Sequence, residues 1–170
     1  MAHTLGEENP VTRRISLLLR RFPFIIRLPY LAFSRIQARY TIGVAAVIID
    51  DRGRVLLVEH AYHPRYPWGL PGGWLDDDEE PAEAIKRELC EELELQVTVL
   101  GGVHIARTAR NHIDLAFHCK ALSPIGKLSH ELLTYQWVAL DQLPDIKRFH
   151  RQSIQAARNE AREEDTWKRV

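Results

Sequence analysis

The sequence predicts an α/β protein in which helices cover a mixed β-sheet, with an arginine-rich, helical N-terminal extension. Segments rich in β-branched residues alternate with two segments whose apolar residues recur at helical spacing, which is typical of layered α/β folds. With 170 residues, 45% of them hydrophobic, the chain is long enough for one well-cored domain. We expect residues 1–39 to form the extension and residues 40–170 to form the domain.

The extension combines arginines with apolar residues. Between Val11 and Arg39 the chain carries seven arginines, no lysine and no acidic residue. Apolar residues recur there at helical spacing, and two prolines divide the segment into short pieces. The apolar residues are Ile15, Leu18, Leu19 and Phe22, and the breaks are Pro23 and Pro29.

Three interpretations of this extension are open. Apolar stripes usually mark packing, so we favour a segment that packs on its own domain or on a second subunit of a homodimer. A basic amphipathic patch at residues 11–39 could instead contact an anionic membrane or attract polyphosphate substrates. The lack of acidic residues would also fit a mitochondrial transit peptide.

Two strands are predicted at the start of the domain. Tyr40–Ile49 and Arg54–Glu59 are rich in β-branched residues, and the turn signal Asp50–Gly53 lies between them. Together these segments predict a β-hairpin. The loop His60–Pro67 follows, and Trp68–Gly73 reads as a strand that leads into a glycine-rich turn.

The second half of the domain contains more strands and a helix. Gln96–Ile105 and Ile113–Ala121 are predicted strands that we expect to be antiparallel neighbours, and Tyr135–Leu140 is a further strand. His150–Glu164 has the apolar periodicity of a C-terminal helix.

Negative charge is concentrated in one short stretch. Ten of the 23 acidic residues lie within residues 76–94, although Lys+Arg and Asp+Glu are equal in number. In a helix after Pro81, Glu88, Glu91 and Glu92 would project from one face. Like charges at that spacing cost stability unless a cation neutralises them, and hard carboxylate oxygens suit Mg²⁺ or Mn²⁺. On charge alone, a solvated helix face explains the cluster equally well.

The spacing around these glutamates resembles the Nudix box, G-x5-E-x7-R-E-U-x-E-E-x-G-U, where U is aliphatic. A pattern that mixes glycine, acidic, basic and apolar requirements is specific. The penultimate box glycine is replaced by Glu94, at a helix end where glycine would take positive φ. Glu94 is therefore expected either to strain the helix exit or to let the helix continue. The eight matching positions are Gly73, Glu79, Arg87, Glu88, Leu89, Glu91, Glu92 and Leu95.

The resemblance covers residues 41–143 and implies a fold and an activity. The fold would be a Nudix-type α/β/α sandwich in which the box forms a loop, a helix and a loop. The activity would be hydrolysis of a nucleoside diphosphate linked to another moiety, with Mg²⁺ or Mn²⁺ as cofactor.

The resemblance also assigns roles within the box. Arg87 would pair with Glu79 and orient the glutamates, and Gly73 would lend its backbone to the metal site. One of the metal-binding glutamates could also serve as the general base. The glutamates that correspond to metal ligands are Glu88, Glu91 and Glu92.

Further site residues are expected from loops. Family members often take another acid from a later loop, for which Glu131 is the first candidate and Asp114 the second. Candidate substrate-binding residues are those that could stack on a base or touch a phosphate. Loop packing or a solvated surface would explain each of them as well. These candidates are Arg65, Tyr66, Arg107 and Arg110.

Two rival functions share the fold, namely a catalytically silent nucleotide-binding module and an isomerase of the isopentenyl diphosphate type. No box glutamate is lost, which argues against the silent module, and the cysteine and glutamate pattern of the isomerase is absent.

Balanced charge predicts a small nucleotide-type substrate and no stable nucleic acid partner. The lack of a signal peptide or long apolar run predicts a cytoplasmic protein. Nucleoside triphosphates, nucleotide sugars and CDP-alcohols remain open as substrates.

Overall fold

The structure is a computed structural model that describes residues 37–167 and residues 11, 16, 19–22, 30 and 33, with backbone only for residues 161–167. The chain divides into two units, Met1–Arg39 and Tyr40–Val170. Most of the first unit lies outside the described residues. The predicted helical extension, and its contact with a second subunit or a membrane, therefore stay predictions.

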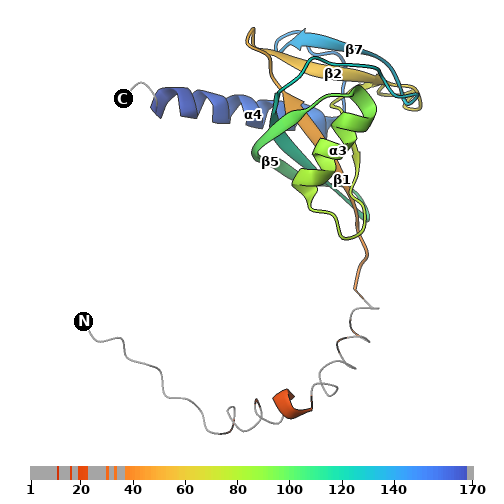
Figure 1. Cartoon of the computed structure of the whole chain (residues 1–170), viewed down its shortest axis with the longest axis vertical. Coiled ribbons are helices and arrows are strands. Elements are labelled where there is room, and N and C mark those ends of the chain that lie inside the picture. The colour runs from red at the N-terminus through yellow and green to blue at the C-terminus, as the bar shows by residue number, and fades with distance from the viewer. Residues whose placement is uncertain are drawn as a thin grey trace. The chain divides into compact units, whose positions relative to one another are not determined.

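Seven strands of the described chain form two sheets in the second unit (Figure 1). The first sheet has the order β4-β1-β6-β5, and the second has the order β3-β2-β7. β1 runs parallel to β6 and the other pairs are antiparallel, so the predicted mixed sheet is confirmed. The strands are β1 (Thr41–Ile48), β2 (Arg54–His60), β3 (Trp68–Gly69), β4 (Gly72–Trp74), β5 (Val97–Ala109), β6 (His112–Ala121) and β7 (Leu132–Ala139).

The predicted hairpin of the first two strands is wrong in its pairing. The turn forms, with the Asp50 backbone N–H donating to the Arg54 carbonyl at 2.9 Å, and one bridge joins Ile49 to Val55. Beyond that point β1 pairs with β4 and β6, whereas β2 pairs with β3 and β7. Both strands are buried over most of their length on both faces, which suits a place between layers better than a two-stranded ribbon.

Two helices, α3 (Pro81–Leu93) and α4 (Arg148–Trp167), pack on different apolar cores. Alternate residues of the central strands enter the two cores, as the period of a β-strand requires. The layered α/β sandwich that the sequence predicts is therefore confirmed. The α3 core takes Val44, Ala46, Ile48, Leu56 and Val58 from the strands. The α4 core takes Ala45, Val47, Val55 and Leu57.

β5 and β6 are antiparallel neighbours, as predicted, but they are longer than expected. β5 continues to Ala109 through several register shifts, so the turn contains only Arg110 and Asn111. Arg107 consequently belongs to a strand, where its backbone is fixed by the sheet.

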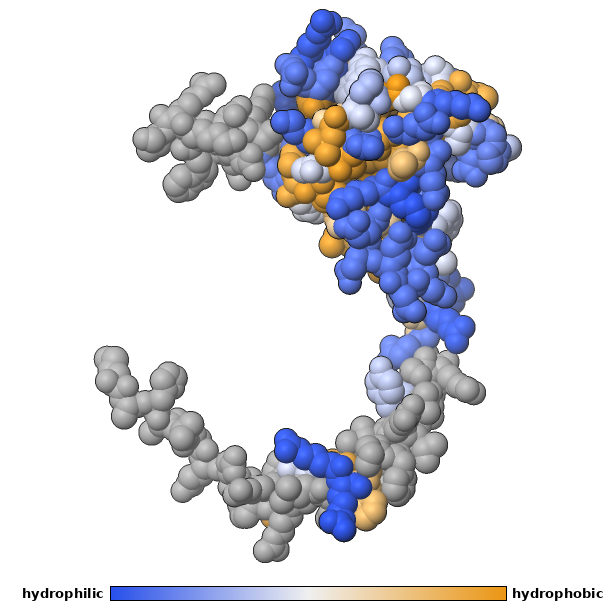
Figure 2. All heavy atoms as spheres, viewed as in Figure 1, coloured by the Kyte–Doolittle hydropathy of each residue, from blue (hydrophilic) through white to orange (hydrophobic). Residues whose placement is uncertain are grey.

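The surface of the second unit is mixed in character. Figure 2 shows apolar residues at the surface beside hydrophilic ones on the face drawn there. Large exposed apolar side chains include Leu100 and Ile105 of β5 and Leu133 of β7. No helix in the described part of the chain is both long enough and apolar enough to cross a bilayer.

Candidate active site

Helix α3 carries the box glutamates and is fixed by its apolar face. Pro81 occupies its first turn, where the missing N–H is not needed. Ile85, Leu89 and Leu93 are fully buried in the core. Glu92 also lies on the buried face, with only 6% of its surface exposed. The glutamate face therefore adjoins the buried apolar face of the helix directly.

Arg87 organises the charged side chains of the helix. Its Nε and Nη2 atoms donate to the two oxygens of Glu79, both at 2.9 Å, and Nη2 also donates to the Trp74 carbonyl at 3.0 Å. Its Nη1 atom donates to Glu88 at 3.0 Å and to Glu91 at 3.3 Å. Hydrogen bonding to Arg87 lowers the pKa of Glu79, and the same bond raises the pKa of Arg87. One planar guanidinium thus fixes three carboxylates.

Strand β4 supplies backbone donors to two of the glutamates. The Gly72 N–H donates to Glu92 at 3.0 Å, and the Trp74 N–H donates to Glu88 at 3.2 Å. Between them, a Cβ atom on Gly73 would lie 2.3 Å from the Glu88 Cδ atom. Only glycine at position 73 leaves room for the Glu88 carboxylate in this place.

The site accumulates negative charge in a poorly solvated position. Burial raises the pKa of Glu92 to about 8, and the charges of Glu88, Glu131 and Glu91 act in the same direction. Burial also raises the pKa of Glu88, against the effect of its bond to Arg87. Glu131, from the loop before β7, therefore acts electrostatically on the box, where the sequence predicts a further acid.

The chemistry of these side chains fits a divalent cation. Their carboxylate oxygens are hard donors, and their mutual repulsion would be relieved by positive charge. Among the residues that the structure describes, no three or more His, Cys, Asp or Glu side chains are already gathered as a metal site. The donors of Arg87 and β4 use one carboxylate oxygen each of Glu88, Glu91 and Glu92, and a carboxylate has two acceptor oxygens, so a cation could bind without replacing these hydrogen bonds.

The conformation of Glu94 decides whether the missing box glycine strains the helix exit or lets the helix continue. The helix ends immediately before it, and Glu94 takes left-handed φ and ψ angles of 47° and 33°. Its N–H donates to the Cys90 carbonyl at 3.0 Å, and the Leu95 N–H donates to the Leu89 carbonyl at 3.1 Å. This is the hydrogen-bond pattern of a helix end that normally favours glycine, so the strained exit is the correct alternative.

The loop before β7 is tied to the end of α3. The Gly126 N–H donates to the Leu93 carbonyl and the Ser129 N–H donates to the Glu92 carbonyl, both at 2.9 Å. The Glu94 carboxylate accepts from the Lys127 N–H at 3.1 Å. Because this loop leads to Glu131, these bonds help to hold that carboxylate beside the box.

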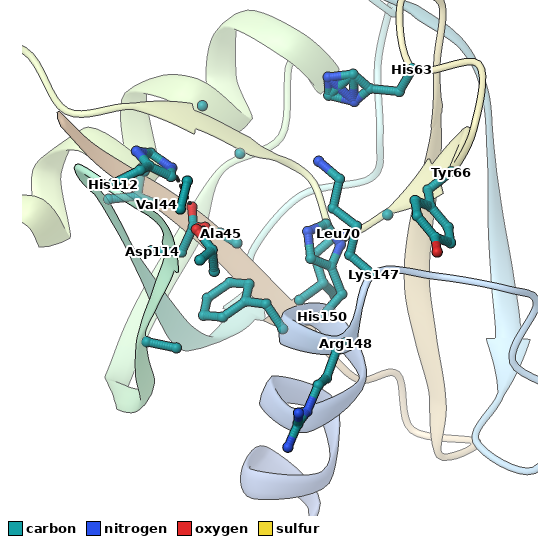
Figure 3. Close-up of a pocket in the computed structure, with 18 of the residues that line it drawn as sticks. Val44, Ala45, His63, Tyr66, Leu70, His112, Asp114, Lys147, Arg148 and His150 are labelled. Atoms are coloured by element: carbon teal, nitrogen blue, oxygen red, sulfur yellow. Dashed lines mark hydrogen bonds and ion pairs between the residues drawn. The ribbon is translucent and has the colours of Figure 1, made fainter.

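A cavity of about 740 Å³, drawn in Figure 3, has residues of β4 in its lining and none of the box glutamates. Its volume suits a nucleotide-sized ligand. Gly72, Gly73 and Trp74 of β4 line it, and the same strand binds Glu88 and Glu92 through its N–H groups. β4 is therefore the element that the cavity and the glutamates share.

Two of the predicted substrate-binding residues line this cavity and two do not. Tyr66 and Arg107 are lining residues. Arg65 is outside the lining and lies over the Tyr66 ring, 5.4 Å from its centroid. Arg110 is also outside the lining, in the turn after β5.

Asp114, the second candidate acid, lies in the cavity and not among the box glutamates. It accepts a hydrogen bond from Thr108 and lies 3.1 Å from the His112 Nε2 atom. The Trp74 ring lies beside His112, with 4.9 Å between centroids. This end of the cavity thus presents an acceptor next to an aromatic surface.

The cavity lining also contains basic side chains that were not predicted as site residues, among them His60, His63, Lys147 and His150. The His150 Nδ1 atom accepts from the Leu70 N–H at 2.8 Å. Burial is the main cause that lowers the pKa of both His60 and His150 to about 4. No local spacing indicates this group, because its members are brought together from separate parts of the chain.

The fold and the site together define a class of protein in which a layered α/β domain carries a helix rich in carboxylates beside a strand that lines a nucleotide-sized pocket. Residues 39–158 match the family model described as NUDIX domain. A MutT-like protein of Streptomyces ambofaciens is 32% identical over 108 residues, which are 62% of this chain and 68% of that protein. The chain belongs to the Nudix hydrolase family, and the predicted enzyme class, a Nudix pyrophosphohydrolase, is confirmed.

Two further relatives share part of the chain or its fold. An RNA pyrophosphohydrolase of Acidiphilium cryptum is 39% identical over 57 residues, which are 32% of this chain and 35% of that protein. The crystal structure of an ADP-ribose pyrophosphatase from Streptococcus suis has the same fold, with a TM-score of 0.61 and 22% identity over 72% of this chain and 92% of that one. Nudix hydrolases generally use divalent metal ions.

Proposed function

We propose that this protein hydrolyses a phosphoanhydride bond of a nucleoside diphosphate linked to another moiety, with Mg²⁺ or Mn²⁺ as cofactor. One observation carries the proposal. Arg87 holds Glu79, Glu88 and Glu91 together, and the β4 backbone that binds Glu88 and Glu92 also lines the pocket. Carboxylates and a substrate would therefore meet along one strand.

In this proposal Glu88, Glu91 and Glu92 hold the cation. A divalent ion neutralises phosphate oxygens and lowers the pKa of bound water. Arg87 and Glu79 keep the glutamates oriented, and Gly73 leaves room for Glu88.

Glu91 is the best placed of the three to accept a proton from the attacking water. Its side chain is 61% exposed, whereas that of Glu88 is 15% exposed and is bonded to β4. The water oxygen would form a bond to phosphorus, and the bridging oxygen would leave with the electron pair of the broken P–O bond. Glu131 would add a further negative charge near Glu92.

The substrate would occupy the adjoining cavity. Tyr66 and Arg107 would contact it, and Arg65 would support Tyr66 through the ring contact. The names of these relatives point to different substrates, ADP-ribose in one and RNA in another, so they do not select one for this chain. We therefore propose the class of nucleoside diphosphate derivatives.

The test is a hydrolysis assay with a panel of nucleoside diphosphate derivatives in Mg²⁺ and in Mn²⁺. Removing a general base costs on the order of 100-fold or more, so Glu91→Gln is expected to lower kcat by at least about that factor. Glu83→Gln is the matched control, because Glu83 lies on the same helix but pairs with Lys86 at the surface. Full activity of Glu91→Gln would refute the site. Nucleotide binding with no turnover would favour the silent binding module.

A further inference from the structure

One end of the cavity is built from basic side chains that the proposed hydrolysis does not use. His60 ends β2, and His63 follows in the next loop. Lys147 directly precedes α4, and His150 lies in its first turn. We call these four residues the basic end. In Figure 3 the Lys147 side chain extends from the start of α4 in the direction of His63, and His150 lies beside it.

Packing brings the histidines of the basic end close together. The His60 and His63 ring centroids are 5.0 Å apart. A Cβ atom on Gly69 would lie 2.7 Å from the His150 Cε1 atom and 3.2 Å from the His60 Nε2 atom. Two imidazoles thus rest against one glycine of β3, which fixes them in the wall of the cavity.

Positive charge at the basic end is not compensated by carboxylates. In the described part of the chain, none of its four residues forms an ion pair. Burial is the largest cause that lowers the pKa of His60, His63 and His150, and the charge of Lys147 lowers all three further. The charge of Asp114 acts in the opposite direction and raises the pKa of His150. An anion here would meet the charge of Lys147, which is not neutralised by an ion pair among the described residues.

The His150 ring has a defined donor. Its Nδ1 atom accepts from the Leu70 N–H, so the neutral ring carries its proton on Nε2. Lys147 adds up to three donors on an exposed, flexible side chain. Both donor types suit a phosphate or carboxylate oxygen.

Asp114 makes the cavity electrically asymmetric. It lines the same cavity, and Figure 3 shows it with His112 on the other side from Lys147 and His63. Its carboxylate would repel an anion and could accept from an amino or hydroxyl group. A charged substrate would therefore bind in one orientation.

We infer that the basic end binds an anionic group of the substrate that is separate from the diphosphate undergoing hydrolysis. The substrate class is then narrower, namely a nucleoside diphosphate derivative with an extra phosphate or carboxylate. This inference rests on the proposed function in taking the scissile diphosphate to lie along β4.

Matched pairs of probes test the inference by direct binding. UDP-glucuronate differs from UDP-glucose by a carboxylate, and NADPH differs from NADH by a ribose phosphate. Isothermal titration calorimetry with the full chain, in EDTA to prevent turnover, gives the affinity ratio within each pair. The wild type is expected to bind the more anionic member of at least one pair about 10-fold more tightly, as one charged hydrogen bond would allow.

Three variants identify the cause of that preference. Lys147→Met should abolish it while leaving the affinity for the less anionic member of each pair within about twofold, since one exposed charge is removed. Lys147→Arg should retain it. Lys120→Met, which removes an exposed lysine of β6 outside the cavity lining, should also retain it. Equal binding within both pairs, or equal weakening of both members by Lys147→Met, would overturn the inference.

Hydrolysis of the same probes with Mg²⁺ separates this inference from the proposed function. Charge preference in binding without hydrolysis of any probe would overturn the function and keep the basic end as an anion site. Hydrolysis without any charge preference would overturn the inference and leave the function standing.

Discussion

The glutamates of α3 and the basic end of the cavity are both packed against glycines of one short stretch of chain. The Glu88 carboxylate rests on Gly73, and the His150 ring rests on Gly69. In both places burial opposes the charged form, so the pKa of Glu92 rises to about 8 and that of His150 falls to about 4. Each region is thus prepared for a partner of opposite sign, a cation on one side and an anion on the other.

The two regions differ in how they are held. The glutamates share one guanidinium and two backbone N–H groups, which fix their positions. Lys147 is exposed and forms no ion pair among the described residues. Disturbing the glutamate region should therefore reduce catalysis with every substrate, whereas disturbing the basic end should change substrate preference.

Paired glycine substitutions give the largest expected contrast. Gly73→Ala places a methyl group 2.3 Å from the Glu88 Cδ atom, so the carboxylate must move and kcat/KM should fall about 100-fold with all substrates. Gly69→Ala displaces the His150 ring instead, and should lower kcat/KM about 10-fold only for the probes that carry the extra phosphate or carboxylate. Steady-state kinetics with the matched probes measures both. If the two variants lost kcat/KM in the same proportion for each probe, the comparison would be contradicted.

Arg87→Lys tests the network of the glutamate region. Lysine cannot reproduce the two parallel bonds to Glu79 while also reaching Glu88 and Glu91. Loss of a residue that orients metal ligands typically costs 10–100-fold, so we expect Mn²⁺ affinity and kcat to fall by about that amount. Calorimetric Mn²⁺ titration is the measurement, and Lys86→Arg on the same helix is the control. Unchanged Mn²⁺ affinity would show that Arg87 does not position the ligands.

The basic end should make stability depend on pH below neutrality. His60 and His150 have folded pKa values of about 4 against an ordinary value of 6.5, so the unfolded chain binds more protons between these values. Their contribution to stability is present above pH 6.5 and is lost as the pH falls towards 4. The slope is at most about 1.4 kcal/mol per pH unit for each histidine. Urea unfolding of His150→Gln should give a flatter profile than wild type, and an identical slope would contradict the account.

Glu94 should give the smallest effect, because two contributions oppose each other. Glycine would relieve left-handed strain of about 1 kcal/mol. It would also remove the Glu94–Lys127 hydrogen bond, which is worth about 1 kcal/mol. Glu94→Gly should therefore shift Tm little, whereas Glu94→Ala, which keeps the strain and loses the bond, should destabilise by about 1 kcal/mol. Thermal unfolding of both variants checks this, and equal Tm values for them would show that the strain is absent.

The same contrast explains what could be predicted from the sequence. The glutamate region lies within residues 72–95, so its residue spacing along one helix and the preceding turn was enough to find it. The helix α3, the layered fold and the antiparallel pair β5–β6 followed from local periodicity in the same way. Glu94 could be singled out, but its conformation could not, because strain and helix extension are both compatible with the sequence.

The basic end could not be found because it depends on long-range packing. The bond between Leu70 and His150 joins residues 80 positions apart. The pairing of β1 with β6 likewise overrides the hairpin signal at Asp50–Gly53, since tertiary partners compete with local turns. Arg65 and Arg110 have suitable chemistry but lie outside the cavity lining, which only the fold determines.

The central claim is that the α3 glutamates support attack of water on a phosphoanhydride in the adjoining pocket. Mass spectrometry of products formed from UDP-glucuronate and NADPH in ¹⁸O-labelled water, with Mg²⁺ or Mn²⁺, tests it most directly. The account predicts one ¹⁸O atom in one phosphate-containing product, with no product formed in EDTA and a strongly reduced rate of product formation in Glu91→Gln. Unlabelled products, or equal rates of labelled-product formation in wild type and Glu91→Gln, would contradict it.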